Sequence, residues 1–118
     1  MKLIKLKNNN WLIDDSYNAN PEAVIASLQT LISFSKSKNL TPVFVFGQMN
    51  ELGKFSQKAH SDIGKLVKNI ELFCIGKETK YTIESAGHGQ YSQTMANLIL
   101  NLEQFIIHNS QFVILIKG

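Results

Sequence analysis

The chain has 118 residues, of which 44% are hydrophobic, and a formal net charge of +3 at pH 7. This size and hydrophobic content suit one domain with a single core. The lysines are scattered and not interleaved with aromatic residues, which argues against a nucleic-acid-binding surface. Cys74 is the single cysteine, which excludes an intrachain disulfide and a cysteine-based zinc site. With no signal peptide and no membrane-spanning apolar run, a cytoplasmic protein is expected.

The first third of the chain predicts an edge hairpin followed by a long helix. Apolar and polar residues alternate at the start, three asparagines follow at residues 8–10, and residues 11–13 are apolar again, which is typical of two antiparallel strands. Asn20 is a suitable N-cap, and Pro21 suits the first position of a helix. Apolar residues at helical spacing continue this helix to about Lys38, with Ser27 expected on its outward face.

The rest of the chain alternates buried strands with amphipathic helices. Strands are predicted at the apolar runs 42–46, 72–75 and 112–116, and helices at residues 59–70, 78–86 and 95–106. Strands that alternate with helices of this length imply right-handed crossovers. We therefore predict an α/β fold with a Rossmann-like, mostly parallel sheet, helices on both of its faces and the antiparallel hairpin at one edge.

Polar residues cluster where the predicted strands end. Asp14 and Asp15 follow the second strand of the hairpin, residues 47–53 follow the strand 42–46, and Lys117 ends the last strand. In open parallel sheets, ligands bind beyond the carboxyl ends of the strands, because loops and helix N-termini converge there. We therefore expect these three segments to meet at one edge of the sheet and to form the candidate site.

Each of these residues has a structural explanation beside the functional one. Two adjacent carboxylates could accept hydrogen bonds from a ribose or help to hold Mg²⁺, or one could begin a turn while the other is exposed. Adjacent strand residues point to opposite faces, so we expect at most one of Asp14 and Asp15 to face a ligand. Asn20 can cap a helix without any ligand. Lys117 could meet a carboxylate or a phosphate, or could reach solvent.

The sequence contains no recognisable catalytic constellation. His60 is expected at the surface or boundary of its helix, His88 lies between two glycines in a loop, and His108 lies near a helix end. The phosphate-binding patterns GxxxxGK(S/T) and GxGxxG are absent, as is a Ser/His/Asp or Cys/His arrangement. We therefore predict no catalytic residue and no metal site within this chain, which should be inactive by itself.

Three segments nevertheless form a recognisable pattern. Residues 13–21 read IDDSYNANP, residues 49–53 read MNELG and are followed by Ser56, His60 and Ile63-Gly64, and residues 113–118 read VILIKG. In order and spacing these segments resemble the Mur ligase family, in the branch that joins D-alanyl-D-alanine to UDP-N-acetylmuramoyl-tripeptide during peptidoglycan synthesis. The resemblance covers essentially the whole chain, and the first segment separates this branch from its siblings.

The resemblance implies a parent enzyme of three domains. An N-terminal domain would bind the UDP-sugar substrate, a central domain would be a P-loop ATPase, and residues 1–118 would be the Rossmann-like C-terminal domain. ATP, with Mg²⁺, would phosphorylate the tripeptide carboxylate, and the amine of D-Ala-D-Ala would attack the acyl phosphate to give an amide, ADP and phosphate. The expected partners are therefore UDP-MurNAc-tripeptide, D-Ala-D-Ala and the central ATPase domain, with no nucleic acid or membrane partner. A closing domain can supply positioning for such chemistry.

The same resemblance assigns residues to the two sides of a cleft. The expected nucleotide-binding residues are Asp14, Asp15, Tyr17, Asn18 and Asn20. The expected substrate-binding residues, on the dipeptide side, are Gly47, Gln48, Met49, Glu51, Leu52 and Lys117.

Two departures from the family pattern are expected to matter. Gln48 stands where the family usually has an aspartate, so an amide replaces a charge. The family's Gly-Arg segment would precede Met1, and its serine and final helix would follow Gly118, so we expect a domain truncated at both ends. The loss of a helix would bare apolar surface, and we therefore expect self-association.

Two other classes of protein share parts of the pattern. A phosphoacceptor receiver domain also pairs acids after an early strand with a late lysine, but it needs an aspartate after its middle strand, where this chain has Phe46, Gly47 and Gln48. A generic NAD(P)-binding domain fits the alternation of strands and helices but needs a glycine fingerprint after its first strand.

Overall fold

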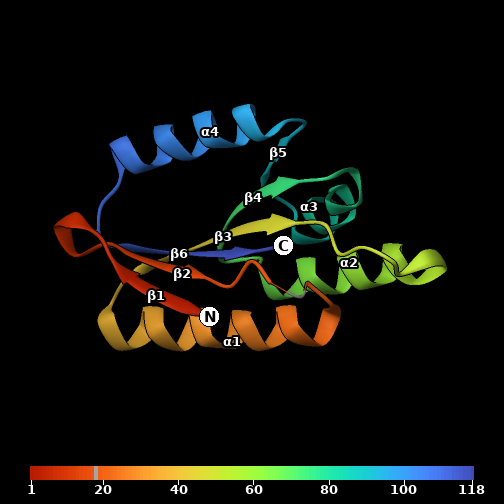
Figure 1. Cartoon of the computed structure of the whole chain (residues 1–118), viewed down its shortest axis with the longest axis horizontal. Coiled ribbons are helices and arrows are strands. Elements are labelled where there is room, and N and C mark those ends of the chain that lie inside the picture. Colours follow the sequence, from red (N-terminus) through yellow and green to blue (C-terminus); the bar gives the residue numbers. More distant parts are fainter. Residues whose placement is uncertain (18) are drawn as a thin grey trace.

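A six-stranded sheet with helices on both faces organises the chain (Figure 1). The computed structural model describes residues 1–17 and 19–118. The strands are β1 (Lys2–Lys5), β2 (Trp11–Asp14), β3 (Thr41–Gly47), β4 (Glu71–Ile75), β5 (Gln90–Ser92) and β6 (Phe112–Lys117), in the order β1-β2-β6-β3-β4-β5. β1 and β2 pair antiparallel, and every other neighbouring pair is parallel. The predicted α/β fold with an antiparallel hairpin at its edge is therefore confirmed.

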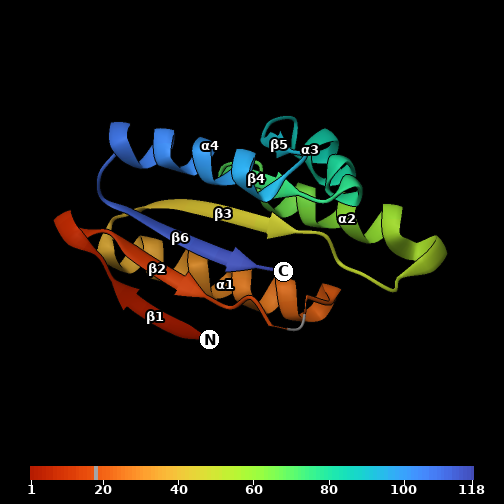
Figure 2. The same cartoon turned by 45° about the horizontal axis from the view of Figure 1, so that its top comes forward.

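Four helices connect the strands and cover the sheet. They are α1 (Pro21–Lys38), α2 (Ser56–Leu66), α3 (Lys80–Ala86) and α4 (Met95–His108), with short 3-10 turns η1 (Lys7–Asn9), η2 (Gly53–Phe55) and η3 (Lys77–Thr79). In Figure 1, α4 lies above the sheet and α1 below it, and in the turned view of Figure 2 the strands β2 and β6 pass in front of α1.

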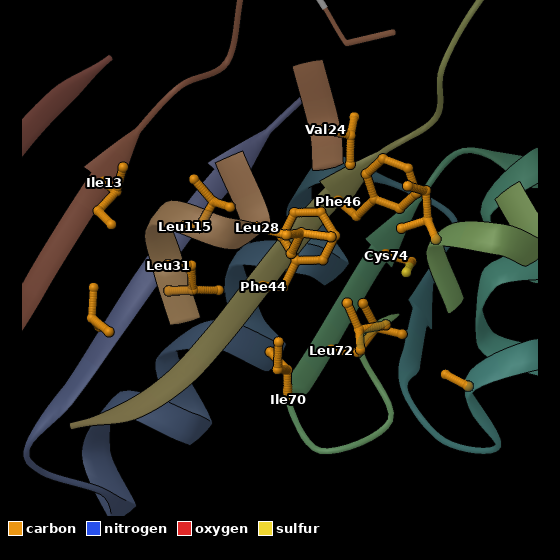
Figure 3. Close-up of a cluster of buried hydrophobic side chains, with 14 of the residues drawn as sticks. Ile13, Val24, Leu28, Leu31, Phe44, Phe46, Ile70, Leu72, Cys74 and Leu115 are labelled. Atoms are coloured by element: carbon orange, nitrogen blue, oxygen red, sulfur yellow. The ribbon is translucent and has the colours of Figure 1, made fainter. Parts of the chain in front are cut away.

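Strict alternation of side chains along the strands creates two cores. In β3, Phe44 and Phe46 join one buried cluster with α1, α2 and α3, whereas Val43 and Val45 join a second cluster beneath α4. This follows from the two-residue period of a strand, which turns neighbouring side chains to opposite faces. Figure 3 shows the first cluster, in which Phe44 and Phe46 lie beside Val24, Leu28 and Leu31 of α1. A strand with large apolar side chains on both faces must lie inside the sheet, which explains the apolar run 42–46.

The ends of the elements show local chemistry that suits their residues at three places. Asn20 caps α1, because its Oδ1 accepts a hydrogen bond of 2.9 Å from the Ala23 amide. Asn39 ends the same helix in a left-handed conformation with φ 56°. In the hairpin connection, Asn8 and Asn9 both have φ 59°, a conformation that asparagine tolerates better than most residues. The predicted cap at Asn20 and the predicted connection at residues 8–10 are therefore confirmed.

Four expectations from the sequence are wrong. β5 is a strand of three residues at a place where the sequence predicted no strand, and α2 ends at Leu66 rather than near residue 70. Ser27 is buried under the sheet, with 2% of its surface exposed, because it lies three residues after Val24 on the inward face of α1. His60 is fully buried at 0% exposure, because it lies at helical spacing from Ile63 and Gly64.

Candidate functional site

The carboxyl ends of β2, β3 and β6 meet around a polar hollow of about 310 Å³. Its lining comes from the segment after β2, the loop after β3 and the end of β6: Ser16, Ala19, Asn20, Gln48, Asn50, Glu51 and Gly118. A second hollow, of about 260 Å³, lies on the other side of the same loop, between residues 48–53 and η3. The three polar segments that were expected to converge are therefore brought together at one edge of the sheet.

Larger hollows lie away from this edge. One of about 630 Å³ lies between η1 and the end of α4, and another of about 580 Å³ lies between the C-terminal ends of α1 and α2. Both border the amino ends of the parallel strands, where ligands of open sheets rarely bind. The smaller polar hollow is therefore the stronger candidate, because it contains the segments that carry the chemistry.

A largely buried ion pair lies at this edge of the sheet, where β2 and β6 end. The Lys117 Nζ lies 3.2 Å from Asp15 Oδ2 and donates a second hydrogen bond of 2.9 Å to the Tyr17 carbonyl oxygen. Only 2% of the Lys117 side chain and 16% of the Asp15 side chain are exposed. The Ser27 hydroxyl of α1 also donates to Asp15 Oδ2. Lys117 therefore meets a carboxylate of its own chain, which is one of the outcomes that the sequence left open.

These contacts keep the Asp15 carboxylate charged. The hydrogen bond from Ser27 is the largest influence and lowers the pKa of Asp15 below its usual value, and the hydrogen bond and charge of Lys117 lower it further against the opposing effect of burial. A charged acceptor between a hydroxyl and an ammonium group satisfies the buried Ser27 and Lys117 together with the partly buried Asp15.

The loop of residues 48–53, hereafter the 48–53 loop, is restrained by hydrogen bonds of the Gln48 side chain. Gln48 Oε1 accepts a hydrogen bond of 3.1 Å from the Glu78 amide, and Gln48 Nε2 donates one of 3.1 Å to Asn50 Oδ1. Glu51 adopts φ 63°, which costs a residue other than glycine about 1–2 kcal/mol. Strain of this kind persists only where the surroundings fix the backbone.

Two glycines permit a close approach beneath the hollow. A Cβ added to Gly47 would lie 3.2 Å from the Gly118 carbonyl oxygen, and a Cβ added to Gly118 would lie 2.7 Å from the Gly47 backbone. Gly118 also has φ 111°, a conformation that side chains rarely allow. The loop after β3 and the end of β6 therefore touch through their backbones, and a side chain at either position would separate them.

The predicted site residues do not all present side chains to the hollow. Asn20, Gln48 and Glu51 line it, whereas the Met49 side chain is buried with 1% exposure and Leu52 packs against the first core.

The other predicted residues lie at the end of β2 and just after it. Tyr17 is 80% exposed, and its carbonyl oxygen accepts a hydrogen bond from Lys117. Asp14 pairs in register with Lys2 and Ile116 within the sheet, on the opposite face to Asp15. Asn18 lies outside the described residues.

Comparison with known proteins places these segments in a family. Residues 1–118 match the Mur ligase, glutamate ligase domain. The chain belongs to the Mur ligase family. Among curated proteins, the UDP-N-acetylmuramoyl-tripeptide–D-alanyl-D-alanine ligase of Escherichia coli K12 is 31% identical over 118 residues, covering 98% of this chain and 25% of that protein. The chain therefore spans about a quarter of the length of such relatives.

Solved structures of Mur ligases have the same fold. MurF from Acinetobacter baumannii aligns with a TM-score of 0.79 and 30% identity over 99% of this chain and 26% of its own. MurF from Thermotoga maritima in complex with ADP aligns with a TM-score of 0.80 and 22% identity over 98% of this chain and 26% of its own, which supports the fold alone. Membership of the Mur ligase family sets aside both the receiver domain and the NAD(P)-binding domain as alternatives.

Several residues of this Mur ligase domain contribute to the site without having been predicted. Ser16, Ala19, Asn50 and Gly118 lie in the segments that were singled out, so their place in the lining follows from their neighbours. Ser27 could have been found from its helical spacing.

Two classes of feature are absent from the described part of the chain. Across residues 1–17 and 19–118, no three side chains of histidine, cysteine, aspartate or glutamate converge in a way that could hold a metal ion. Over the same residues, no helix combines the length and the apolar character that crossing a membrane requires.

Proposed function

We propose that this chain is the C-terminal, cleft-closing domain of an ATP-dependent ligase that joins D-Ala-D-Ala to UDP-MurNAc-tripeptide in the cytoplasm. The observation that supports this most is the polar hollow at the carboxyl ends of the strands. It combines the segment IDDSYNANP, the MNELG loop and the VILIKG strand, which are the three segments that resemble this branch of the family. The reaction of the relatives, rather than any catalytic group in this chain, suggests the chemistry.

The segment after β2 is proposed to face the nucleotide through Asp15, Tyr17, Asn18 and Asn20. Asp14, the last residue of β2, lies on the opposite face of the sheet and is left out of this proposal. Asp15 fits this role because Ser27 and Lys117 both bond to its Oδ2, whereas Oδ1 has only the Met1 amino group at 3.8 Å, too far for a hydrogen bond, and can accept from a ribose hydroxyl. Because the Tyr17 ring is exposed, it can pack against a base. These residues orient a nucleotide and transfer no proton.

The loop after β3 is proposed to face the incoming dipeptide. Glu51 offers a carboxylate to the D-Ala-D-Ala ammonium group, and the Gln48 amide offers a donor to its carboxylate. Gly47, Met49, Leu52 and Lys117 act from beneath, by fixing the backbone of the loop and the end of β6. Positioning of this kind raises the rate by holding the amine near its target.

ATP supplies the acyl phosphate on which the amide bond depends. We assign its phosphates and the Mg²⁺ ion to the central ATPase domain, because the described residues of this chain offer no converging set of metal ligands. The contribution of the present domain is then to close over the substrates and exclude water.

The proposal is tested by grafting this chain in place of the matching quarter of the Escherichia coli ligase and following the pentapeptide product and ADP. The graft should ligate D-Ala-D-Ala, and Glu51→Gln should reduce kcat/KM about tenfold by removing one charged contact. Glu103→Gln, on the exposed part of α4, is the matched control and should not change the rate.

The 118-residue chain itself should neither bind ATP tightly nor hydrolyse it, which isothermal titration and an ADP assay can measure. Tight binding or turnover by the chain alone would contradict the division of the site between domains. A folded graft that makes no product would count against the proposed reaction.

A further inference from the structure

His60 occupies a buried position between helix α2 and the 48–53 loop. Its side chain is fully buried, and its ring lies 5.8 Å from the Phe46 ring, measured between centroids. The Thr82 hydroxyl donates to the His60 backbone carbonyl at 2.9 Å, which ties α3 to the same turn of α2. The ring therefore packs against β3, the backbone of the same residue is bonded to α3, and the ring has no access to solvent.

The two ring nitrogens of His60 have different partners, and these define its tautomer. Nδ1 lies 2.8 Å from the Ser56 carbonyl oxygen, which can only accept, so Nδ1 carries the proton. Nε2 lies 3.0 Å from the Met49 amide nitrogen, which can only donate, so Nε2 carries none. The neutral imidazole thus connects the backbone of α2 to the backbone of the 48–53 loop.

This bond acts on the strained part of the loop. Met49 directly precedes Asn50 and Glu51, which line both hollows, and Glu51 has φ 63°. Backbone conformations of this kind require external restraint. Gln48 restrains the loop at its start through the Glu78 amide, and His60 restrains it one residue later. Without the second restraint the loop can relax toward a commoner conformation.

We propose that His60 is a positioning residue, which as its neutral Nδ1-protonated tautomer fixes the 48–53 loop and thereby sets the orientation of Asn50 and Glu51 in the hollow. Its consequence for dipeptide binding rests on the function proposed above. Its effect on the loop does not.

NMR on the chain itself tests whether His60 fixes the 48–53 loop. Long-range nitrogen–proton correlations in the unsubstituted protein should show a protonated Nδ1 and an unprotonated Nε2 at His60, and the opposite tautomer would overturn the proposal. His60→Leu should speed exchange of the Met49 amide about tenfold relative to the Val45 amide, because the acceptor is lost. His60→Gln should largely restore protection, because its Oε1 reaches the former position of Nε2.

A histidine elsewhere provides the matched control. His88 Nε2 lies 3.0 Å from the Val67 carbonyl oxygen, so His88→Leu also removes a histidine hydrogen bond from the same protein. That variant should leave the Met49 amide as protected as before, relative to Val45. Equal exchange at Met49 in His60→Leu and His88→Leu would show that His60 merely fills the core.

The graft described above tests whether His60 affects binding of the dipeptide. His60→Leu should raise KM for D-Ala-D-Ala about tenfold with KM for ATP unchanged, and His60→Gln should recover most of that loss. Unchanged dipeptide KM in a His60→Leu graft whose Met49 amide exchanges freely would overturn the positioning role. If the unsubstituted graft makes no product, the proposed function fails, whereas the tautomer and exchange measurements still decide whether His60 holds the loop.

Discussion

The ammonium group of Lys117 lies 3.2 Å from Asp15 Oδ2, and it joins two strands at the place where both end. The Asp15 carboxylate and the Lys117 ammonium group, each of which could have bound a ligand, thus neutralise one another inside the domain. Because Lys117 also donates to the Tyr17 carbonyl oxygen, the end of β6 fixes the first residues after β2. The contact therefore shapes the nucleotide side of the candidate site from beneath.

Replacing Lys117 with methionine should destabilise the domain by about 3 kcal/mol, because Asp15 would remain charged and largely buried without its partner. Urea unfolding followed by Trp11 fluorescence measures this change. Lys2→Met, on the exposed edge strand β1, is the control and should stay within about 0.5 kcal/mol of the unsubstituted protein.

A double-mutant cycle separates the pair from the packing of the lysine stem. Asp15→Asn combined with Lys117→Met should be less destabilising than the sum of the single changes by about 1–2 kcal/mol, since neither charge is then left alone. Strict additivity would show that the pair contributes nothing beyond its separate contacts.

The lowered pKa of Asp15 predicts a loss of stability in acid. A carboxyl whose pKa is lower in the folded state than in the unfolded state stabilises the fold fully above its unfolded pKa, about 3.9, and loses that contribution as the pH falls through the folded pKa. The free energy of unfolding should therefore fall below about pH 4. Asp15→Asn should flatten this part of the curve, as measured by urea unfolding from neutral to acid pH.

Asp62 serves as the comparison for that experiment. Its pKa is also lowered, by the hydrogen bond and charge of Lys58 and by Lys65, but it lies on the exposed surface of α2. Asp62→Asn should change the free energy of unfolding at acid pH less than Asp15→Asn does. The effect of Asp62→Asn should also become smaller when salt is added. An equal or larger effect of Asp62→Asn would count against the importance of the buried pair.

Most of the fold could be predicted because its signals are local and periodic. The apolar run 42–46 and the pair Asn20-Pro21 each determine an element without reference to the rest of the chain. The strand β5 escaped prediction because Gln90–Ser92 carry no apolar run and become a strand only by pairing with β4. Strand character there comes from the tertiary contact.

The site was predicted at the level of segments and less well at the level of side chains. Asp15 and Lys117 follow Ile13 and Leu115 by two residues, so the alternation of the strands turns both toward α1 and toward each other. That parity was available in the sequence, but their pairing also requires β2 and β6 to be neighbours, which sequence spacing does not specify. Residue polarity predicts Ser27 and His60 on outward faces, whereas both lie on the inward face of a helix, where hydrogen bonds satisfy their polar atoms.

Gly64 should be intolerant of any side chain. A Cβ at this position would lie 2.4 Å from the Thr82 carbonyl oxygen and 2.7 Å from Ser85 Cβ, where α2 packs against α3. Gly64→Ala should therefore destabilise the domain by about 2–3 kcal/mol, although alanine is the better helix former. Thermal unfolding checks this, with Lys65→Ala on the exposed face of α2 as the control. A stabilised Gly64→Ala protein would contradict the close packing of these helices.

Cys74 should be chemically silent in the folded protein. Burial raises the pKa of its thiol to about 12, and the side chain is fully buried in the first core. Because only the thiolate is an effective nucleophile, iodoacetamide should label the native chain very slowly and label it fast in urea. Mass spectrometry follows the reaction, and rapid labelling of the native chain would show that this core opens readily.

The outer face of α4 predicts that copies of the chain associate at high concentration. Five apolar side chains of this helix are 44% to 70% exposed, namely Met95, Ile99, Leu100, Ile106 and Ile107. Exposed apolar side chains in this number on one helix promote association. Light scattering should therefore give a weight-average mass that rises with concentration, and the pair Leu100→Lys and Ile107→Lys should reduce the rise. Gln29→Lys with Ser33→Lys on exposed positions of α1 adds the same charge elsewhere and should have less effect. A constant monomer mass over the whole range, or equal effects of the two pairs, would contradict association through α4.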